Sequence, residues 1–289
     1  MEKYINCIVH SSSEGNLLIG ENKTVLFDCG MAFCADVTIQ NVKNALNGRP
    51  LDYIFMTHTH YDHIGALPFF RKEWPLLQTA TSETGAAVLL KDTPRRIIRE
   101  LSAVAAEREN VKLAEYSDDA FHADIIIKDG DIIPLGGFSV QVAETPGHTR
   151  DTIAFFIPEL ELLILNETFG VLLPDGYMYP SYLTSYNDAV TSIKKCRRMP
   201  YKYLSLPHRG VAGKEDTKIF FDKAMETANT CRDFILGAAE KNPSEEEMLQ
   251  LFYQKFYNET LFRFQPKEAF MANARATITC TLREFPNSA

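Results

Sequence analysis

The feature that most constrains this chain is the run Thr57-His58-Thr59-His60-Tyr61-Asp62-His63. It directly follows residues 51–56, a largely apolar stretch that predicts a short buried strand. Three histidines and one aspartate fall within six positions of a chain that has only seven histidines. Because zinc, iron and manganese all accept imidazole and carboxylate ligands, this run predicts a metal-binding loop at the end of a strand.

The spacing within the run divides these ligands between two positions. In an extended segment the side chains of His58 and His60 point the same way, so both can reach one ion. Asp62 and His63 come just past the turn and can reach a second ion beside the first. The alternative is a polar loop with chance histidines. The metal interpretation therefore requires further ligands at other strand ends.

The pattern T-H-T-H-Y-D-H-I-G resembles the H-x-H-x-D-H signature of the metallo-β-lactamase superfamily of hydrolases. The resemblance extends over roughly the first two thirds of the chain. It implies an α/β (α+β) fold, the αββα metallo-β-lactamase sandwich, with one or two metal ions at one edge. We expect a catalytic domain of this kind over residues 1–213 and a helical C-terminal extension over residues 214–289.

Two further segments resemble motifs of the same family. His148 lies in the segment T-P-G-H-T, which resembles the family's P-G-H-[ST] loop. His208 lies in L-P-H-R-G, which resembles its closing P-x-H-x-G segment. Both follow expected strands, as the metal interpretation requires.

A third segment departs from the family. Asn166-Glu167 stands where the family usually has Gly-Asp, whose aspartate bridges the two ions. Glutamate carries the same carboxylate on a side chain that is longer by one methylene. The substitution leaves open whether both ions bind and which metal they are.

The resemblance implies a specific ligand set and mechanism. One ion is held by His58, His60 and His148 and the second by Asp62, His63 and His208, with Glu167 between them. We expect two divalent metal ions, with zinc as the first candidate and iron or manganese as alternatives. Their joint charge lowers the pKa of a shared water toward about 7, and the metal-bound hydroxide attacks a carbonyl carbon. Asp62 is the expected catalytic residue, since it also lies beside that water.

Several features around the site leave alternatives open. Asp28 ends the expected strand 24–28 and serves either as a support for the metal loop or as a turn residue. Residues 92–123 form an expected helical insertion, which is either a lid over the site or surface decoration. The tyrosine-rich stretch 177–186 either lines the pocket or packs its loop onto the core. His10 and His122 match no family position, and we expect both to be ordinary histidines.

The expected function is a metal-dependent hydrolase of a thioester, lactone or similar small ester. The order of the elements is similar to that of the glyoxalase II-like and quinolone signal response thioesterase branch. The alternatives are a non-catalytic or single-metal regulatory protein of the same fold and a nuclease of the superfamily. A diiron reductase is disfavoured because that branch has a glutamate where this chain has His60.

Composition and net charge limit the kinds of binding partner that we expect. A net charge of −8 and a pI of about 5.5 disfavour binding to a phosphate backbone, so we expect a small-molecule substrate and no nucleic acid. The sequence shows neither a membrane-spanning apolar run nor a signal-peptide core, so we expect a cytoplasmic protein with no membrane partner. The six scattered cysteines predict reduced, buried thiols. The aromatic-rich C-terminal helices are a candidate homodimer interface.

Overall fold

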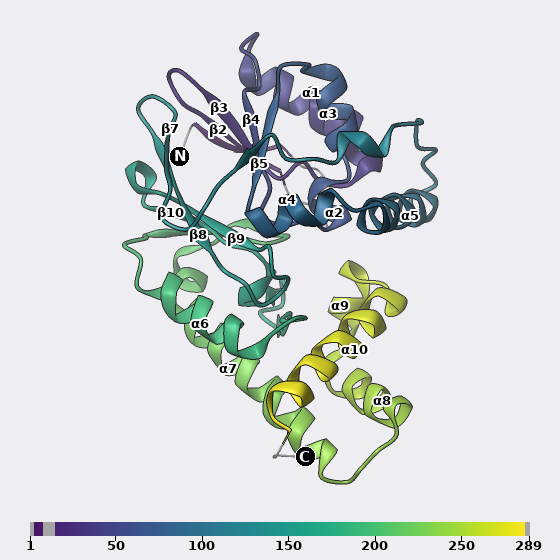
Figure 1. Ribbon diagram of the computed structural model, residues 1–289. Coiled ribbons are helices and arrows are strands. Elements are labelled where there is room, and N and C mark those ends of the chain that lie inside the picture. Colours follow the sequence, from purple (N-terminus) through teal and green to yellow (C-terminus); the bar gives the residue numbers. More distant parts are fainter. Residues whose placement is uncertain (1–2, 8–14, 287–289) are drawn as a thin grey trace. The chain divides into compact units, whose positions relative to one another are not determined.

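The computed structural model describes residues 3–7 and 15–286, which form two compact units (Figure 1). Unit 1 contains the described residues up to Glu144 together with Ile153–Leu163. Unit 2 contains Thr145–Thr152 and the described residues from Ile164 onward. The predicted mixed α/β fold is confirmed, including its helical C-terminal region. The predicted domain boundary at residue 213 stays a prediction.

The first sheet of unit 1 has six strands in sequence order. They are β1 (Tyr4–Asn6), β2 (Asn16–Ile19), β3 (Thr24–Phe27), β4 (Tyr53–Phe55), β5 (Gln78–Thr81) and β6 (Ile125–Ile126). The first three pair antiparallel, and β3 to β6 run parallel. Parallel strands end at the same edge of a sheet. The residues that follow β3 and β4 are therefore neighbours, and these are Asp28 and the 57–63 loop.

Unit 1 also contains the strands β7 (Ile132–Pro134), β8 (Ser139–Glu144), β9 (Ile153–Ile157) and most of β10 (Leu162–Ile164), in the spatial order β10-β9-β8-β7. Buried aromatic rings join them to the first sheet. The ring of Phe155 in β9 lies 5.1 Å from that of Phe27 and 5.7 Å from that of Phe55, measured between centroids. The Phe155 side chain of β9 thus packs one sheet on the other, as the predicted sandwich requires.

Helices cover the first sheet and bury its apolar side chains. They are η1 (Ala32–Cys34), α1 (Ala35–Leu46), α2 (Tyr61–Ile64), α3 (Leu67–Glu73), α4 (Glu83–Leu89) and α5 (Asp92–Arg108), with the short turns η2 (Asp118–Ala120) and η3 (Pro158–Leu160). Leu26 and Ile54 of the sheet share one buried cluster with Val42 of α1 and Phe70 of α3. This packing fixes the strand ends that precede Asp28 and the 57–63 loop.

The insertion contains one long helix followed by a mostly irregular segment. Its long helix, α5, ends at Arg108, and after it only η2 is helical. Helix α5 contacts η1 and the short helix α2, and it buries Ile98, Ser102 and Ala106. The insertion therefore packs against the short helix α2 at the end of the 57–63 loop. Its function as a lid stays a prediction.

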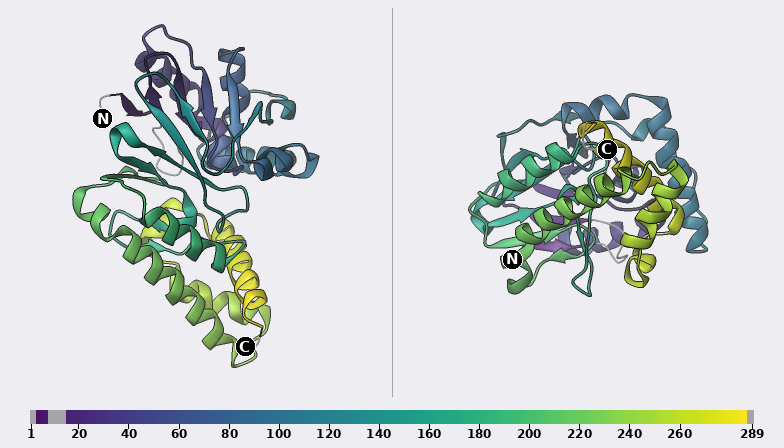
Figure 2. Two further views of the ribbon diagram at one scale, coloured as in Figure 1. Left: turned by 60° about the vertical axis from the view of Figure 1, so that its left-hand side comes forward. Right: turned by 90° about the horizontal axis from the view of Figure 1, so that it is seen from below.

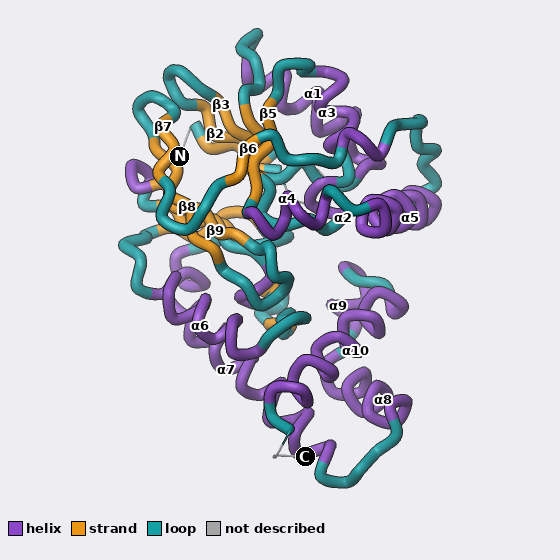
Figure 3. The backbone as a smooth tube through the Cα atoms, viewed as in Figure 1, coloured by secondary structure: helices purple, strands orange, loops and turns teal. Residues whose placement is uncertain are grey.

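Unit 2 is mainly helical (Figures 2 and 3). It contains η4 (Glu167–Phe169), β11 (Val171–Leu172), β12 (Met178–Tyr179), α6 (Tyr186–Arg197), β13 (Tyr203–Leu206), β14 (Gly210–Val211), α7 (Lys214–Ala239), α8 (Glu245–Phe256), α9 (Glu259–Phe264) and α10 (Lys267–Glu284). Helix α7 contacts α6, α8 and α10. Buried rings of α8 and α10 meet, with Phe252 and Phe270 5.9 Å apart between centroids.

Helix capping agrees with the sequence at one helix and corrects it at another. The spacing of Ser244 and Glu247 in the sequence predicts a capping box, and the two residues form it at the start of α8. The sequence also predicts a helix over residues 187–199 with Asn187 as its N-cap. That cap is wrong, because α6 starts earlier and the side chain of Ser185 accepts a hydrogen bond from the backbone N–H of Asp188. Either residue type suits an N-cap, so composition alone does not choose between them.

Two further observations concern the described residues. All six cysteines are buried and form no disulfide. Among the described helices there is none with enough length and apolar character to cross a bilayer.

Candidate metal centre

The 57–63 loop is held at its first residue by Asp28. The Asp28 carboxylate accepts hydrogen bonds from the Thr57 backbone N–H and hydroxyl, both at 2.7 Å. Asp28 has a φ of 57°, in the left-handed region that aspartate tolerates better than most residues. From the other sheet of unit 1, the Ile153 N–H donates to the Thr57 carbonyl at 2.7 Å. The interpretation of Asp28 as a support for the loop is therefore confirmed.

Asp28 also sets the orientation of His63. The Nδ1 atom of His63 lies 2.8 Å from Asp28 Oδ2, the oxygen that also accepts from the Thr57 hydroxyl. The side chains of His63 and Asp28 are almost completely buried. The His63 carbonyl accepts hydrogen bonds from the N–H groups of Cys29 and Gly30 at 2.8 and 2.9 Å. Since a carboxylate only accepts, Nδ1 carries the proton and Nε2 carries the lone pair. This is the tautomer of a histidine that binds a metal through Nε2.

The other ligands of the loop lie as their spacing predicts. The rings of His58 and His60 are 4.5 Å apart between centroids, and a ligand atom of one lies within 4.8 Å of a ligand atom of the other. His58 is fully buried and His60 partly exposed. Asp62 and His63 share the helix α2, where the Oδ2 atom of Asp62 lies 3.6 Å from His63 Nε2. Unit 1 therefore presents four candidate ligands within one loop.

In unit 2, His148 sits in a tight turn that only glycine permits. Gly147 has a φ of 147°, and a Cβ atom there would come within 2.7 Å of the Thr168 side chain and 2.8 Å of Ala189. The His148 N–H donates to the Thr168 hydroxyl at 3.0 Å. Its Nδ1 atom donates to the Ser181 carbonyl at 2.6 Å, because a carbonyl oxygen only accepts. His148 thus shows the same tautomer as His63.

Glu167 and His208 form a close pair in the same unit. Glu167 Oε1 lies 2.8 Å from His208 Nε2, and both side chains are largely buried. Glu167 begins η4 directly after β10, and Asn166 caps that turn by accepting from the Thr168 N–H at 3.0 Å. The Asn166 amide also donates to the Thr145 hydroxyl at 2.8 Å. Asn166 therefore has a structural role of its own, and the glutamate beside it is oriented toward a histidine.

Three of the supporting residues are not indicated by any sequence motif. Thr57, Thr168 and Ser181 position candidate ligands through hydrogen bonds, yet hydroxyl residues are common in loops. The one available signal is that Thr57 precedes His58 in the motif. Ser181 lies 33 residues from His148, so no local pattern connects the two.

The tyrosine-rich stretch packs onto the helices of unit 2. The hydroxyls of Tyr177, Tyr182 and Tyr186 bond Phe256, Thr281 and Asn229, respectively, and the fourth tyrosine, Tyr179, is buried. The packing interpretation is therefore supported.

The two histidines outside the family pattern differ in what the structure describes. His122 binds locally, with Nδ1 2.7 Å from the Asp119 carbonyl and Nε2 3.2 Å from Asp124. It therefore behaves as the ordinary histidine that we expect. His10 lies outside the described residues.

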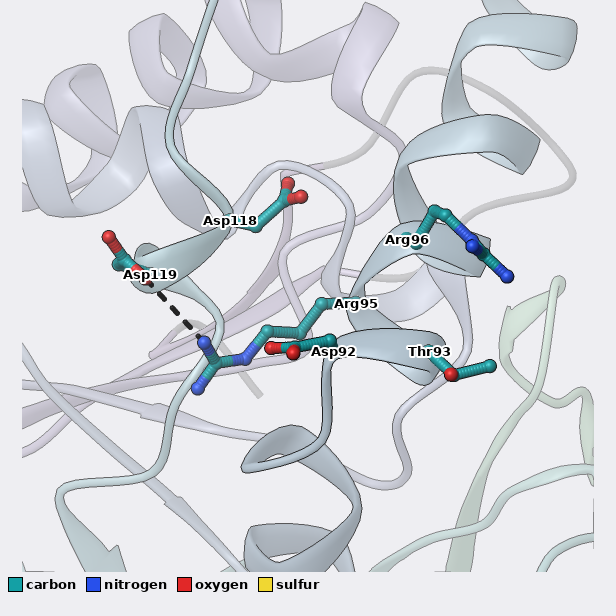
Figure 4. A pocket seen from close by; sticks show the side chains of 6 residues that line it. All are labelled: Asp92, Thr93, Arg95, Arg96, Asp118 and Asp119. Carbon is teal, nitrogen blue, oxygen red and sulfur yellow. Dashed lines mark ion pairs between the residues drawn. The ribbon is translucent and has the colours of Figure 1, made fainter.

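A pocket of about 320 Å³ lies elsewhere in unit 1, on the insertion (Figure 4). Residues of both charges line it, with three aspartates and two arginines among six residues: Asp92, Thr93, Arg95, Arg96, Asp118 and Asp119. Arg95 and Asp119 form an ion pair across it, with 3.6 Å between charged atoms. No candidate metal ligand lines this pocket, so it is separate from the site.

The donor atoms fit a divalent metal. Five imidazoles and two carboxylates stand at or just after strand ends, and most of them are buried. Neutral nitrogen and anionic oxygen donors of this kind suit zinc, iron and manganese. The fixed Nδ1 contacts of His63 and His148 are the outer hydrogen bonds that accompany ligating histidines.

Known proteins similar to this chain share parts of its sequence. Hydroxyacylglutathione hydrolase of Rhodopseudomonas palustris (strain BisB5) is 26% identical over 121 residues, which cover 42% of this chain and 35% of that protein. The chain thus spans about a third of that relative's length. The metallo-beta-lactamase fold-containing protein ST1585 of Sulfurisphaera tokodaii is 24% identical over 206 residues, covering 68% of this chain and 72% of that protein.

The fold has close counterparts among solved structures. The metallo-beta-lactamase family protein TTHA1429 from Thermus thermophilus superposes with a TM-score of 0.65 at 16% identity, covering 99% of this chain and 94% of that one. The model of the metallo-beta-lactamase superfamily matches residues 16–208, which include every candidate ligand. From its sequence motifs, its fold and this match, the chain belongs to the metallo-beta-lactamase superfamily.

Proposed function

We propose that this protein is a metal-dependent hydrolase of a thioester, lactone or similar small ester. The observation that carries the proposal is the matched orientation of His63 and His148. In each, Nδ1 faces an acceptor in the protein, at 2.8 and 2.6 Å, and Nε2 is left as the ligand nitrogen. Two imidazoles held in this way on separate segments are typical of a metal site.

The proposed ligand sets follow from the donors that each segment supplies. As the sequence motifs imply, we propose that His58, His60 and His148 would hold the first ion and that Asp62, His63 and His208 would hold the second, with the Glu167 carboxylate between them. We propose zinc in both positions, with iron or manganese as alternatives that the same donors accept. Glu167 stands where the family usually has the aspartate that lies between the two ions.

The residues of the chain have separate tasks in the proposed reaction. When bound, the two ions supply a water that is activated near neutral pH, and they polarise the substrate carbonyl. Asp62 would accept a proton from the attacking water as the water adds to the carbonyl carbon. The bond from that carbon to the ester oxygen or thioester sulfur then breaks. The leaving group takes the proton from Asp62, which returns the carboxylate to its starting state.

Two observations support the substrate class. The similarity to a hydroxyacylglutathione hydrolase, a thioester hydrolase by its name, covers 42% of this chain. The net charge of −8 disfavours a nucleic-acid substrate, because phosphate backbones bind cationic surfaces. We therefore propose a small-molecule substrate.

The test measures metal content and activity together. The protein is purified without chelator, its metal per chain is determined by plasma mass spectrometry, and hydrolysis of generic thioesters, lactones and a single-stranded RNA is assayed. We expect two ions per chain and turnover of a thioester or lactone. Glu167→Gln should reduce the content to about one ion and the activity by roughly 10- to 100-fold, since it removes an anionic ligand.

The matched control is Glu159→Gln, which alters a carboxylate of unit 1 that accepts hydrogen bonds from the Ser139 N–H and hydroxyl and is no candidate ligand. It should leave both the metal content and the activity unchanged. One ion or none in the unaltered protein, with no ester hydrolysis, would favour the single-metal or regulatory alternative. Cleavage of RNA in place of esters would favour the nuclease.

A further inference from the structure

The segment Ser181–Ser185 of unit 2 lies between a candidate metal ligand and the C-terminal helix. Its carbonyl at Ser181 accepts the Nδ1 proton of His148 at 2.6 Å, and the Ser181 hydroxyl lies 3.2 Å from the same nitrogen. Ser181 is only 4% exposed and Tyr182 only 2%. A backbone carbonyl can hold an imidazole in place only if its own segment is held in place. The contacts that hold the Ser181–Ser185 segment therefore affect the orientation of His148.

On one side the segment is anchored to the turn that carries His148. The carbonyl of Gly147 accepts hydrogen bonds from the N–H groups of Leu183 and Thr184 at 3.1 and 3.0 Å. The Thr184 hydroxyl donates to the same carbonyl at 3.1 Å. The Ser181–Ser185 segment is therefore hydrogen-bonded both to the His148 ring and to the backbone of the preceding residue, Gly147.

On the other side the segment is anchored to α10, nearly a hundred residues later in the chain. The Tyr182 hydroxyl donates to that of Thr281 at 3.2 Å, since the Thr281 hydroxyl itself donates to the Thr277 carbonyl. The Thr277 hydroxyl lies 3.1 Å from the Tyr182 carbonyl. Arg283 donates to the Thr184 carbonyl at 2.7 Å. Thr277 and Thr281 are completely buried, so their hydroxyls have no competing solvent contact.

We propose that α10 orients His148 through the Ser181–Ser185 segment, so that the C-terminal helices form part of the support of the metal centre. Tyr182, Thr277 and Thr281 are positioning residues in this scheme, because they act on the ligand through the Ser181–Ser185 segment and not by direct contact. The inference rests on the proposed metal centre, and it gives the helical extension a task distinct from covering the site or forming a dimer. Similar outer contacts of ligating histidines affect metal affinity 10- to 100-fold.

The experiment uses the full chain with Tyr182→Phe and Thr277→Val, which remove hydroxyls while nearly keeping side-chain shape. Nitrogen-15 NMR of the histidine rings in metal-free protein reports which nitrogen of His148 carries the proton. Competition with a chromogenic chelator gives the affinity for zinc. We expect the variants to weaken the His148 Nδ1 proton signal and to lower the affinity for one of the two ions by about tenfold.

Two controls separate positioning from general stability. Tyr186→Phe removes a hydroxyl that bonds Asn229 of α7 rather than α10, and it should leave the His148 signal and both affinities unchanged. Thr277→Ser keeps the hydroxyl and should restore both readouts. A His148 signal and zinc affinity in Tyr182→Phe and Thr277→Val equal to those of the unaltered protein would overturn the inference, while two ions per chain would leave the proposed function standing. An unaltered protein that binds no ion would instead overturn the proposed function, and the inference with it.

Discussion

At the scale of single residues, the site depends on side chains that hold ligands as much as on the ligands themselves. Asp28 bonds both the first residue of the 57–63 loop and the imidazole of His63. Ser181 does the same for His148 with a backbone carbonyl. The carboxylate and the carbonyl select the same tautomer, because each accepts a hydrogen bond from Nδ1 and neither can donate one.

Asp28→Asn should weaken metal binding at the set that contains His63. The amide lacks the negative charge that attracts the Nδ1 proton, and its NH₂ group can face the histidine in place of an oxygen. We expect a loss of roughly 10- to 100-fold in zinc affinity, measured by chelator competition.

The matched control for this change is Asp52→Asn. Asp52 accepts hydrogen bonds from the Thr24 N–H and hydroxyl at 2.9 and 3.3 Å, in the same sheet, but it contacts no candidate ligand. Equal losses of affinity in the two variants would show that the Asp28 effect reflects the sheet and not the orientation of His63.

At the scale of elements, each candidate ligand is placed by the start of a turn or helix. The loop after β4 leads into the short helix α2, and η4 starts at Glu167 directly after β10. The asparagine of the Asn166-Glu167 departure from the family has a structural role at this scale. Asn166 caps η4 and binds Thr145, a role that the usual glycine cannot fill because it has no side chain.

The corrected start of α6 can be tested in the same terms. Ser185→Ala removes the side-chain acceptor of the helix and should lower the free energy of unfolding by about 1 kcal/mol. Asn187→Ala should change it by less than about 0.5 kcal/mol, since Asn187 is exposed and its backbone N–H keeps its bond to Glu284. Urea denaturation of the metal-free protein measures both. The opposite ranking would restore Asn187 as the cap.

At the scale of the whole molecule, the buried thiols link stability to pH. Burial raises the pKa of Cys34 to about 11 and those of Cys7, Cys231 and Cys280 to about 12. In the unfolded chain these thiols ionise near pH 8.5. Between these values the unfolded state binds fewer protons than the folded state, so stability falls as the pH rises.

We therefore expect the melting temperature to be constant near pH 7 to 8 and to fall steadily above about pH 9. The thiols of the folded protein should react with a thiol reagent at pH 8 far more slowly than those of the denatured chain. Scanning calorimetry across this pH range and the reaction rates check the two parts. Rapid labelling of all six cysteines in the native state would contradict the burial on which the prediction depends.

The sequence predicts the mixed α/β fold class, which the structure confirms, whereas the candidate ligands and their division between two ions stay predictions. These follow from local information: strand periodicity, the spacing of His58, His60, Asp62 and His63, and motifs that each fit within about seven residues. The start of α6 was misplaced by local reasoning because two good capping residues, Ser185 and Asn187, lie two positions apart.

The tertiary structure alone decided what holds the ligands in place. Asp28 and His63 are 35 residues apart in the chain, Ser181 is 33 from His148, and Thr281 is 99 from Tyr182. Their hydrogen bonds exist only because strand order and helix packing bring these residues together. No short pattern encodes such contacts, because a hydroxyl or carbonyl becomes specific only through the partner that folding places beside it.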